Sequence, residues 1–257
     1  MDTKELKTVR LSLKNRVLRL QLYRPESNNS INDEMVRECG DVIDEYSDQI
    51  SILIIEGLSD CFCSGADFSD LTSKEKSSKP DHFAPEPLYR LWETLATGPF
   101  ISIAHIRGNV NAGGMGFVAA CDLALADSDA EFALSELLFG LMPACVLPFL
   151  IKRIGRQKAH SMTLMTSSIN VHEAHRIGLV DAFAEDSNDL LRKWLLRLTR
   201  LEKSAVYRYK KYMARLDASL SESRPLALEA NKEVLSDPQI LNNISRFLSS
   251  GKFPWEN

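Results

Sequence analysis

Two short glycine-bearing stretches have the residue types needed to hold an oxygen atom that gains negative charge during a reaction. The first is Cys63-Ser64-Gly65-Ala66-Asp67-Phe68, and the second is Ala112-Gly113-Gly114-Met115-Gly116. Glycines let the backbone approach a ligand closely, and free N–H groups at the start of a helix favour an anionic oxygen. Two such N–H groups that meet at one point form an oxyanion hole, in which each donor lowers a barrier by about 3–4 kcal/mol. Either stretch alone is also typical of a tight turn between a strand and a helix.

Glu136 is the acidic residue with the strongest case for acid/base chemistry. It lies among apolar residues that include Leu134, Leu137 and Phe139. A carboxyl group partly buried among such neighbours has its pKa raised, which suits a group that takes up and releases a proton near neutral pH. The other interpretation is a glutamate in the first turn of a helix that Ser135 caps.

Histidine and cysteine patterns give little support for a metal site. His160, His172 and His175 have no acidic or cysteine partners at metal-ligand spacing, and Cys61-Phe62-Cys63 is too close for the usual C-x-x-C knuckle. His105 falls in an apolar strand, where a hydrogen-bonded core histidine is expected rather than a catalyst. The glycines are followed by no Lys-Ser or Lys-Thr pair and form no G-x-G-x-x-G, so a phosphate-binding loop is also excluded.

The elements that must position these residues alternate between strands and helices. Apolar alternation or short apolar runs predict strands over residues 9–13, 17–22, 52–55, 100–106 and 123–126. Helices are predicted between them, including one capped by Asn32 or Asp33 and one that opens at the second glycine stretch. This alternation predicts an α/β fold with crossover connections.

The second half of the chain follows a different pattern. From about residue 145 onward it is predicted to be almost wholly helical, and Val206, Tyr209, Met213 and Leu216 form an apolar stripe at helical spacing. Such a stripe fits a cap or an oligomer interface. The polar segment 73–80 is predicted to be a mobile loop.

Composition limits the class of protein. Of 257 residues, 44% are hydrophobic and 26% charged, with 31 Lys+Arg against 35 Asp+Glu and a net charge of −4. This predicts one sizeable core and gives no reason to expect nucleic-acid binding. The five cysteines predict reduced thiols. The N-terminus lacks a signal peptide and no apolar run approaches the roughly 20 residues that span a membrane, so a cytoplasmic protein with no membrane partner is expected.

Several motifs, in their order and spacing, resemble those of the crotonase (enoyl-CoA hydratase/isomerase) superfamily over the whole chain. They are Ser64-Gly65-Ala66-Asp67, Val110-Asn111-Ala112-Gly113-Gly114, Cys121-Asp122, and Ser135-Glu136 with Gly140. Within it, the chain most resembles the PksH-like dehydratases of polyketide β-branching cassettes. That likeness lies in Glu86-Pro87-Leu88-Tyr89-Arg90-Leu91-Trp92, Leu134-Ser135-Glu136-Leu137-Leu138-Phe139-Gly140, Pro143-Ala144-Cys145-Val146-Leu147-Pro148-Phe149-Leu150 and Phe253-Pro254-Trp255-Glu256.

The resemblance implies a fold with a crotonase-like ββα spiral core over residues 1–195. Residues 196–257 would form a C-terminal helical region of the same structural unit, used for trimerisation. Trimers, or hexamers built from two trimers, are the family precedent. The superfamily acts on acyl thioesters carried on pantetheine, so no cofactor is implied beyond the phosphopantetheine that carries the substrate.

The resemblance also implies roles for individual residues. The oxyanion-hole N–H groups would be those of Ala66 and Gly113, or Gly114 if the register differs by one residue. Glu136 matches the second catalytic glutamate of the family. The first is replaced by Gly116, which puts two-carboxylate hydration of a simple enoyl-CoA in doubt.

Asp67 is the candidate for a second acid/base group, with a structural, helix-capping role as the equal alternative. Asn109 and Asn111 can position a substrate hydroxyl or carboxylate, although an asparagine beside glycines is more often a turn residue. Tyr89 would lie on a helix that lines the acyl pocket. For Trp92, on the same helix, core packing is the expected role.

The implied reaction is that of a lyase, the removal of water from 3-hydroxy-3-methylglutaryl-acyl carrier protein to give 3-methylglutaconyl-acyl carrier protein. One alternative is an enoyl-thioester isomerase that uses Glu136 alone, and another is a non-catalytic scaffold that binds carriers. The partner would be an acidic acyl carrier protein. Two basic clusters can guide it or simply be solvated helix faces: Lys152, Arg153, Arg156 and Lys158, and Arg208, Lys210 and Lys211.

Overall fold

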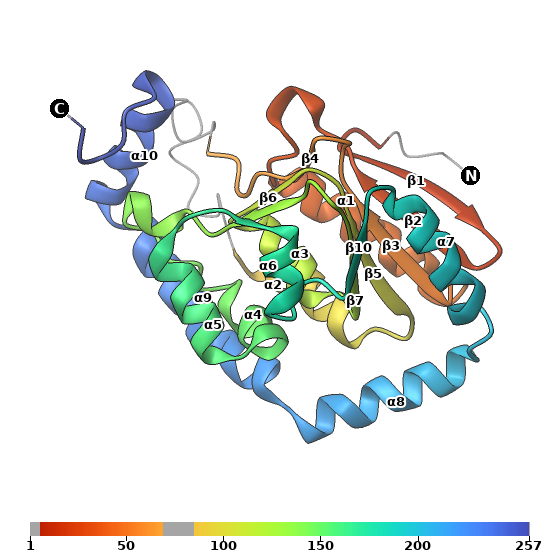
Figure 1. The fold of residues 1–257 in the computed structure, drawn as a ribbon. Helices are drawn as coiled ribbons and strands as arrows, with labels where there is room; N and C mark the ends of the chain where they lie inside the picture. The colour runs from red at the N-terminus through yellow and green to blue at the C-terminus, as the bar shows by residue number, and fades with distance from the viewer. Residues whose placement is uncertain (1–5, 69–84, 257) are drawn as a thin grey trace.

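Two β-sheets form the framework of the molecule in the computed structural model, which describes residues 6–68 and 85–256 (Figure 1). The predicted loop at 73–80 lies outside these residues. The larger sheet has six strands in the order β1-β2-β3-β5-β7-β10. They are β1 (Val9–Lys14), β2 (Val17–Leu22), β3 (Ile52–Glu56), β5 (Ile101–Ile106), β7 (Leu123–Asp127) and β10 (Ala182–Ala184). Only β1 and β2 pair antiparallel in this sheet, and the other neighbours are parallel.

The smaller sheet has four strands in the order β4-β6-β8-β9. They are β4 (Cys61–Cys63), β6 (Asn109–Asn111), β8 (Glu131–Ala133) and β9 (Ile169–Asn170). The first three are parallel to one another, and β9 pairs antiparallel with β8. Because parallel neighbours end at the same edge of a sheet, the segments that follow β4, β6 and β8 are brought together.

Helices follow the strand pairs in a repeating order. The chain runs β3-β4-α2, then β5-β6-α3, then β7-β8 and the 3-10 helix η3, so each unit gives one strand to each sheet. The helices are α1 (Asp33–Tyr46), α2 (Pro85–Thr97), α3 (Gly114–Ala120), α4 (Leu147–Ile154), α5 (Arg156–Met165), α6 (Val171–Arg176), α7 (Ser187–Leu198), α8 (Lys203–Leu216), α9 (Ser219–Leu235) and α10 (Pro238–Ser250), with 3-10 helices η1 (Pro25–Ser27) and η3 (Glu136–Phe139). The predicted α/β fold is confirmed, and Asn32 caps α1 by accepting from the Met35 N–H.

The apolar run of β3 is buried on both sides, as the sequence predicts. Leu53 and Ile55 belong to the main core, whereas Ile52 and Ile54 belong to a second cluster packed against Leu191 of α7. Successive side chains of a strand point to opposite faces, so a central parallel strand needs apolar residues at every position.

The prediction of an almost wholly helical second half is wrong in one respect. Two short strands, β9 and β10, interrupt the helices, and β10 extends the large sheet beside β7. Strand β10 has three residues, Ala-Phe-Ala, all partly buried, and a run this short carries no strand signal of its own. The predicted division between residues 195 and 196 falls inside α7.

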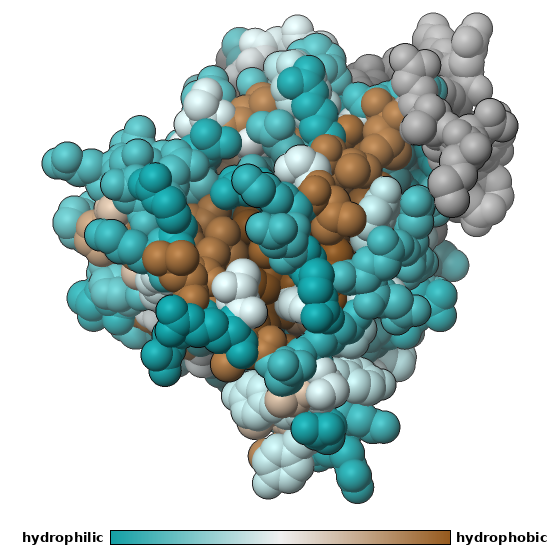
Figure 2. Space-filling view, turned by 90° about the vertical axis from the view of Figure 1, so that its right-hand side faces the viewer, coloured by the Kyte–Doolittle hydropathy of each residue, from teal (hydrophilic) through white to brown (hydrophobic). Residues whose placement is uncertain are grey.

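Apolar side chains of α8 are exposed on the described chain. Tyr209 and Leu216 are each 62% exposed, while Val206 packs against the second cluster beneath α7. Seen from the side that carries β1 and α7, the surface is hydrophilic over most of its area and has a hydrophobic area near its centre (Figure 2). None of the described helices is both long and apolar enough to cross a membrane.

Candidate active site

The two glycine-bearing loops lie against each other at the ends of β4 and β6. A Cβ atom added to Gly65 would lie 2.8 Å from the Ala112 Cβ and 3.5 Å from the Gly113 nitrogen. Gly65 has a φ of +102°, and Ala112 has a φ of +50° although it is not a glycine. Close approach and left-handed backbone therefore explain the small residues of both loops.

The backbone of the first loop turns the Ala66 N–H away from its neighbour. Ile31 donates its N–H to the Gly65 carbonyl at 2.7 Å and accepts from the Asp67 N–H at 2.8 Å. The N–H of Ala66 belongs to the same trans peptide as the Gly65 carbonyl, so it points in the opposite direction. Among the described residues it donates to no backbone carbonyl.

The N–H of Gly113 is also without a backbone acceptor among the described residues. Gly113 is the N-cap of α3, and the first N–H groups of a helix have no partner within it. The backbone nitrogen of Ala66 lies 3.8 Å from the Cβ position of Gly113. Gly114, the alternative position, is buried and does not line the cleft described below; it packs against β4, since an added Cβ would lie 2.6 Å from the Cys63 carbonyl oxygen. The geometry thus favours Ala66 and Gly113 as the pair of donors.

Ala66 and Gly113 line a cleft of about 930 Å³ together with Glu136. Its walls come mainly from α1, α2, the second glycine loop, the segment that follows η3, and α9. The charged side chains that line it beside Glu136 are Asp33, Arg37, Asp41, Asp44, Arg90, Glu93 and Arg224. The structure therefore brings the candidate donors and the candidate acid into one cavity.

Glu136 begins the four-residue helix η3, directly after β8 and the buried Leu134. Burial raises the pKa of its carboxyl group to about 7, while a backbone hydrogen bond opposes that shift. The Oε2 atom is buried and has no hydrogen-bond partner among the described residues. A carboxyl group with this pKa is present in both protonation states near neutral pH and can take or give a proton.

The alternative view of Glu136, as part of a helix capped by Ser135, does not fit the contacts. The Ser135 side chain makes no capping bond, and its Oγ accepts from Asn111 Nδ2 at 2.9 Å. Next to Asn111, Ala112 donates its N–H to the Ala133 carbonyl at 3.1 Å. These two bonds tie the second glycine loop to the segment that carries Glu136. The Oδ1 atom of Asn111 is buried without a partner among the described residues.

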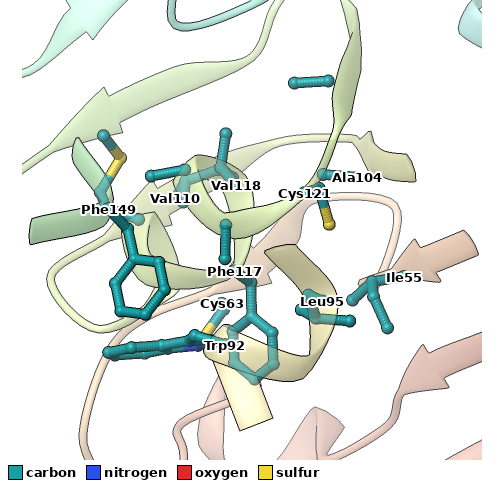
Figure 3. Close-up of a cluster of buried hydrophobic side chains, with 14 of the residues drawn as sticks. Ile55, Cys63, Trp92, Leu95, Ala104, Val110, Phe117, Val118, Cys121 and Phe149 are labelled. Carbon is teal, nitrogen blue, oxygen red and sulfur yellow. The ribbon is translucent and has the colours of Figure 1, made fainter. Parts of the chain in front are cut away.

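Trp92 occupies the space beside Gly116, where the resemblance places a second carboxylate. A Cβ at Gly116 would lie 2.3 Å from the Cζ2 atom of the Trp92 ring. The indole packs edge-on against Phe117 and Phe149, with ring centroids 5.9 and 5.8 Å away (Figure 3). Core packing, the predicted role of Trp92, is confirmed. The ring also lines the cleft, and its Nε1–H is buried without a partner among the described residues.

Asn111 and Gly114 do not line the cleft, and three further predicted residues also lie outside the cleft-lining set. The Asp67 carboxylate pairs with Arg24 at 2.8 Å, and both side chains are only 13% exposed. Tyr89 is buried on α2, and its hydroxyl donates to the Leu220 carbonyl at 2.7 Å. Asn109 is exposed on β6. The structure thus gives Asp67 and Tyr89 partners within the protein, and Asn111 is the predicted polar residue that contacts the Glu136 segment.

His105 is a core histidine, as predicted. It is fully buried on β5, with Nδ1 at 2.8 Å from Glu56 Oε1 and Nε2 at 2.7 Å from Ser187 Oγ. Hydrogen bonding to His105 and the charge of Arg19 lower the pKa of Glu56 despite its burial. Within residues 6–68 and 85–256 no group of three or more potential ligands is placed to hold a metal ion.

Both basic clusters contain a side chain committed to the interior. Lys210 is buried and donates to the carbonyls of Leu95 and Phe100 and to Asp122 at 2.7–3.1 Å. Arg153 is 9% exposed at its side chain and pairs with Asp181 at 2.6 Å. Lys210 and Arg153 therefore stabilise the fold. For these two residues, neither of the predicted roles, a docking surface or a solvated helix face, is correct.

The role of Arg24 and the contact of the Trp92 indole with Gly116 could not be predicted from the sequence. Arg24 sits in a turn sequence, and its contact with Asp67 joins segments far apart in the chain, which no local pattern indicates. The sequence showed that Gly116 replaces the first glutamate of the family, but it did not show that the Trp92 side chain fills that space.

Comparison with known proteins adds independent information. Residues 12–257 match the family profile described as enoyl-CoA hydratase/isomerase. The chain is 49% identical to the bacillaene synthase dehydratase PksH of Bacillus subtilis (strain 168), over 100% of both chains. It is 29% identical to 2,3-dehydroadipyl-CoA hydratase of Escherichia coli (strain K12), over 89% of this chain and 82% of that protein.

Solved structures agree with these matches. The crystal structure of a polyketide biosynthesis enoyl-CoA hydratase (PksH) from Bacillus subtilis superposes with a TM-score of 0.94 at 49% identity, covering 97% of this chain and 100% of that one. An enoyl-CoA hydratase structure from Mycobacterium avium paratuberculosis gives a TM-score of 0.83 at 22% identity, covering 97% of this chain and 99% of that one, which supports the fold alone.

Proposed function

The chain belongs to the enoyl-CoA hydratase/isomerase family, and from that membership we propose that it is a dehydratase of polyketide biosynthesis. Its substrate would be 3-hydroxy-3-methylglutaryl-acyl carrier protein and its product 3-methylglutaconyl-acyl carrier protein. The name of the relative at 49% identity, a bacillaene synthase dehydratase, supports this class of reaction. Loss of water involves proton transfers and no net oxidation, so the reaction itself needs no redox cofactor.

One observation carries the proposal: the Glu136 carboxyl group, with a pKa near 7, lines the same cleft as two backbone N–H groups that have no backbone acceptor among the described residues. The Ala66 and Gly113 N–H groups would hold the thioester carbonyl oxygen. When a base removes the α-proton, negative charge collects on that oxygen, where the two donors stabilise it. An ordinary carboxylate can then act as the base.

Glu136 would serve both halves of the elimination. Its carboxylate takes the α-proton and becomes a carboxylic acid. The electron pair of the enolate then forms the double bond as the bond between C3 and the hydroxyl oxygen breaks. The protonated Glu136 gives its proton to the departing oxygen, so water leaves and the carboxylate is restored. Such a syn elimination requires no carboxylate at Gly116, where Trp92 fills the space.

Asp67 would then act indirectly. Its ion pair with Arg24 and its N–H bond to Ile31 fix the loop that carries Ala66. Asn111 would position the Glu136 segment through Ser135 and has a buried Oδ1 atom able to accept a substrate hydroxyl.

The test is a product mass. Purified protein incubated with the carrier-bound substrate should yield an acyl group lighter by one water molecule, and Glu136→Gln should abolish this change while the circular dichroism spectrum is unchanged. Glu185→Gln, which alters an exposed carboxylate, is the matched control. Loss of carbon dioxide in place of water would refute the proposed reaction.

An isomerase is the second candidate, because a site with glycine at position 116 has one of the two family carboxylates. In that case Glu136 would move a proton between two carbons of an enoyl thioester. Incubation in heavy water separates the two reactions, since an isomerase introduces deuterium without loss of water. Carrier binding without any product would instead support a scaffold.

The exposed apolar residues of α8 support the proposal of a homotrimer, or a hexamer of two trimers. Monomeric proteins rarely expose large contiguous apolar areas, and α8 exposes Tyr209, Tyr212 and Leu216 at 60% or more. Light scattering coupled to size-exclusion chromatography should give three or six times the mass of 28.9 kDa for one chain. A monomer at micromolar concentration would contradict this proposal.

A further inference from the structure

Four aromatic side chains connect the C-terminus of the chain to the element that carries Glu136. Phe139, the last residue of η3, lies 5.0 Å from the Phe247 ring of α10 and 5.8 Å from the Phe253 ring beyond it, between ring centroids. Phe247 and Phe253 are 4.9 Å apart, and Phe253 stacks on Trp255 at 4.8 Å. We call these four residues the C-terminal aromatic cluster. Aromatic pairs at such distances stabilise beyond their buried area.

A small apolar group lies next to this cluster and is separate from the main core. Leu141, Ile240 and Ile244 are its buried members, and Phe68 and Leu235 are among the side chains that pack against it. Phe68 lies two residues after Ala66, and Leu141 lies two residues after the end of η3. Helix α10, at the end of the molecule away from the large sheet, therefore contributes to an apolar group that includes residues next to both parts of the site (Figure 1).

The element η3 has few means of fixing its own position. It has four residues, and none of them is buried as a whole, although the Oε2 atom of Glu136 is buried. The two ends of η3 are closed by backbone bonds at 3.1 Å, from the Leu138 N–H to Ser135 and from the Gly140 N–H to Leu137. Such a short helix is not stable alone, so contacts with other elements must hold it. Helix α10 supplies these through Phe247 and through Asn243, whose Nδ2 donates to the Phe139 carbonyl at 3.3 Å.

We propose that Phe247 and Phe253 are positioning residues, which hold η3 through Phe139 and thereby keep the Glu136 carboxyl group buried in the cleft. The inference rests on the proposed acid/base role of Glu136. Helix α10 is thus part of the active-site support as well as part of the C-terminal helical region. Because the cluster is separate from the main core, its loss should release η3 without unfolding the sheets.

The experiment compares Phe247→Ala with Leu248→Ala, a change at the adjacent residue of α10, whose side chain is 46% exposed. Phe247→Ala should lower kcat by about 10- to 100-fold with a smaller effect on KM, because the reacting group is misplaced. Phe247→Tyr, which keeps the ring, should restore most of the activity. Leu248→Ala should behave as the unaltered protein.

The decisive readout is the pKa of Glu136, measured by NMR on protein with isotope-labelled glutamate and assigned with Glu136→Gln. In Phe247→Ala it should fall from about 7 toward the ordinary value of 4.5, because the carboxyl group gains solvent. This measurement needs no substrate, so it separates the positioning proposal from the proposed reaction. Loss of activity with the same pKa would refute positioning, as would unchanged activity and pKa.

A second variant covers the case in which Phe247→Ala fails to fold. Phe253→Ala removes a ring beyond the end of α10, which leaves the helix itself intact. It should shift the Glu136 pKa in the same direction by a smaller amount. An effect of Phe253→Ala on thermal unfolding of the whole protein, with no effect on this pKa, would overturn the proposal.

Discussion

Replacing Glu136 by glutamine should remove catalysis and yet stabilise the folded protein at neutral and alkaline pH. Burial raises the pKa of the Glu136 carboxyl group in the folded protein from 4.5 to about 7. At about 1.4 kcal/mol for each tenfold change, the ionised form costs the folded state roughly 2–3 kcal/mol once its partial exposure to solvent is allowed for. Glutamine has nearly the same shape and no charge, so it does not carry this cost.

The pH range of the effect follows from the two pKa values. Below about 4.5 the carboxyl group is protonated in both folded and unfolded chains, so both proteins should be equally stable there. As the pH rises through this value the unfolded chain loses its proton first, and the stability of the unaltered protein falls until Glu136 is ionised above pH 7. The advantage of Glu136→Gln should therefore appear between these limits and reach its full size near pH 8.

Urea denaturation at several pH values, followed by circular dichroism, measures the difference. Glu185→Gln, at an exposed site, should show no comparable pH-dependent gain. If Glu136→Gln were no more stable than the unaltered protein at pH 8, the carboxyl group would not be buried as the structure has it. The reasoning about its proton affinity would then fail, whatever its effect on activity.

Three further predictions concern the same site. The kcat/KM of the dehydration should rise with pH and level off above about 7, as Glu136 becomes an ionised base, and a flat profile between pH 5 and 8 would contradict that role. Gly116→Ala should lower the free energy of unfolding by about 1–3 kcal/mol through the clash with the indole, and Trp92→Phe in the same chain should recover part of the loss in thermal melting. Asp67→Asn breaks the ion pair with Arg24, so it should lower the free energy of unfolding by about 1–3 kcal/mol and change kcat less than about tenfold. A kcat lowered about 1000-fold at unchanged stability would instead make Asp67 a catalytic residue.

The framework of the fold could be predicted because its signals are local. The alternation over β2, in which every second residue is buried, and the doubly buried run of β3 follow directly from which face each side chain occupies. In β1 the same alternation predicts a strand, but Leu11 and Leu13 are exposed. Strand β10 could not be predicted, because a three-residue strand takes its place from pairing with β7 and not from its own sequence. Local patterns describe long elements well and short ones poorly.

The site divides in the same way. The small residues of both loops and the apolar surroundings of Glu136 are visible in the sequence, and the raised pKa of Glu136 agrees with that expectation. Tyr89 looked like a pocket residue, but the pairing of its hydroxyl with Leu220 depends on a contact between α2 and α9. Lys210 looked like part of a surface cluster, but it reaches Asp122 across the fold. Contacts between distant elements decide which way a polar side chain faces, and no spacing rule contains them.

The burial that gives Glu136 its proton affinity also opposes folding, so activity and stability must conflict at this residue. The element that carries this carboxyl group, η3, packs against α10, and the apolar group between them shares no buried member with the main core. The two sheets place the ends of β4, β6 and β8 side by side, and this arrangement does not depend on the protonation state of one carboxyl group. A costly charge can therefore be held beside a stable framework without weakening the pairing of its strands.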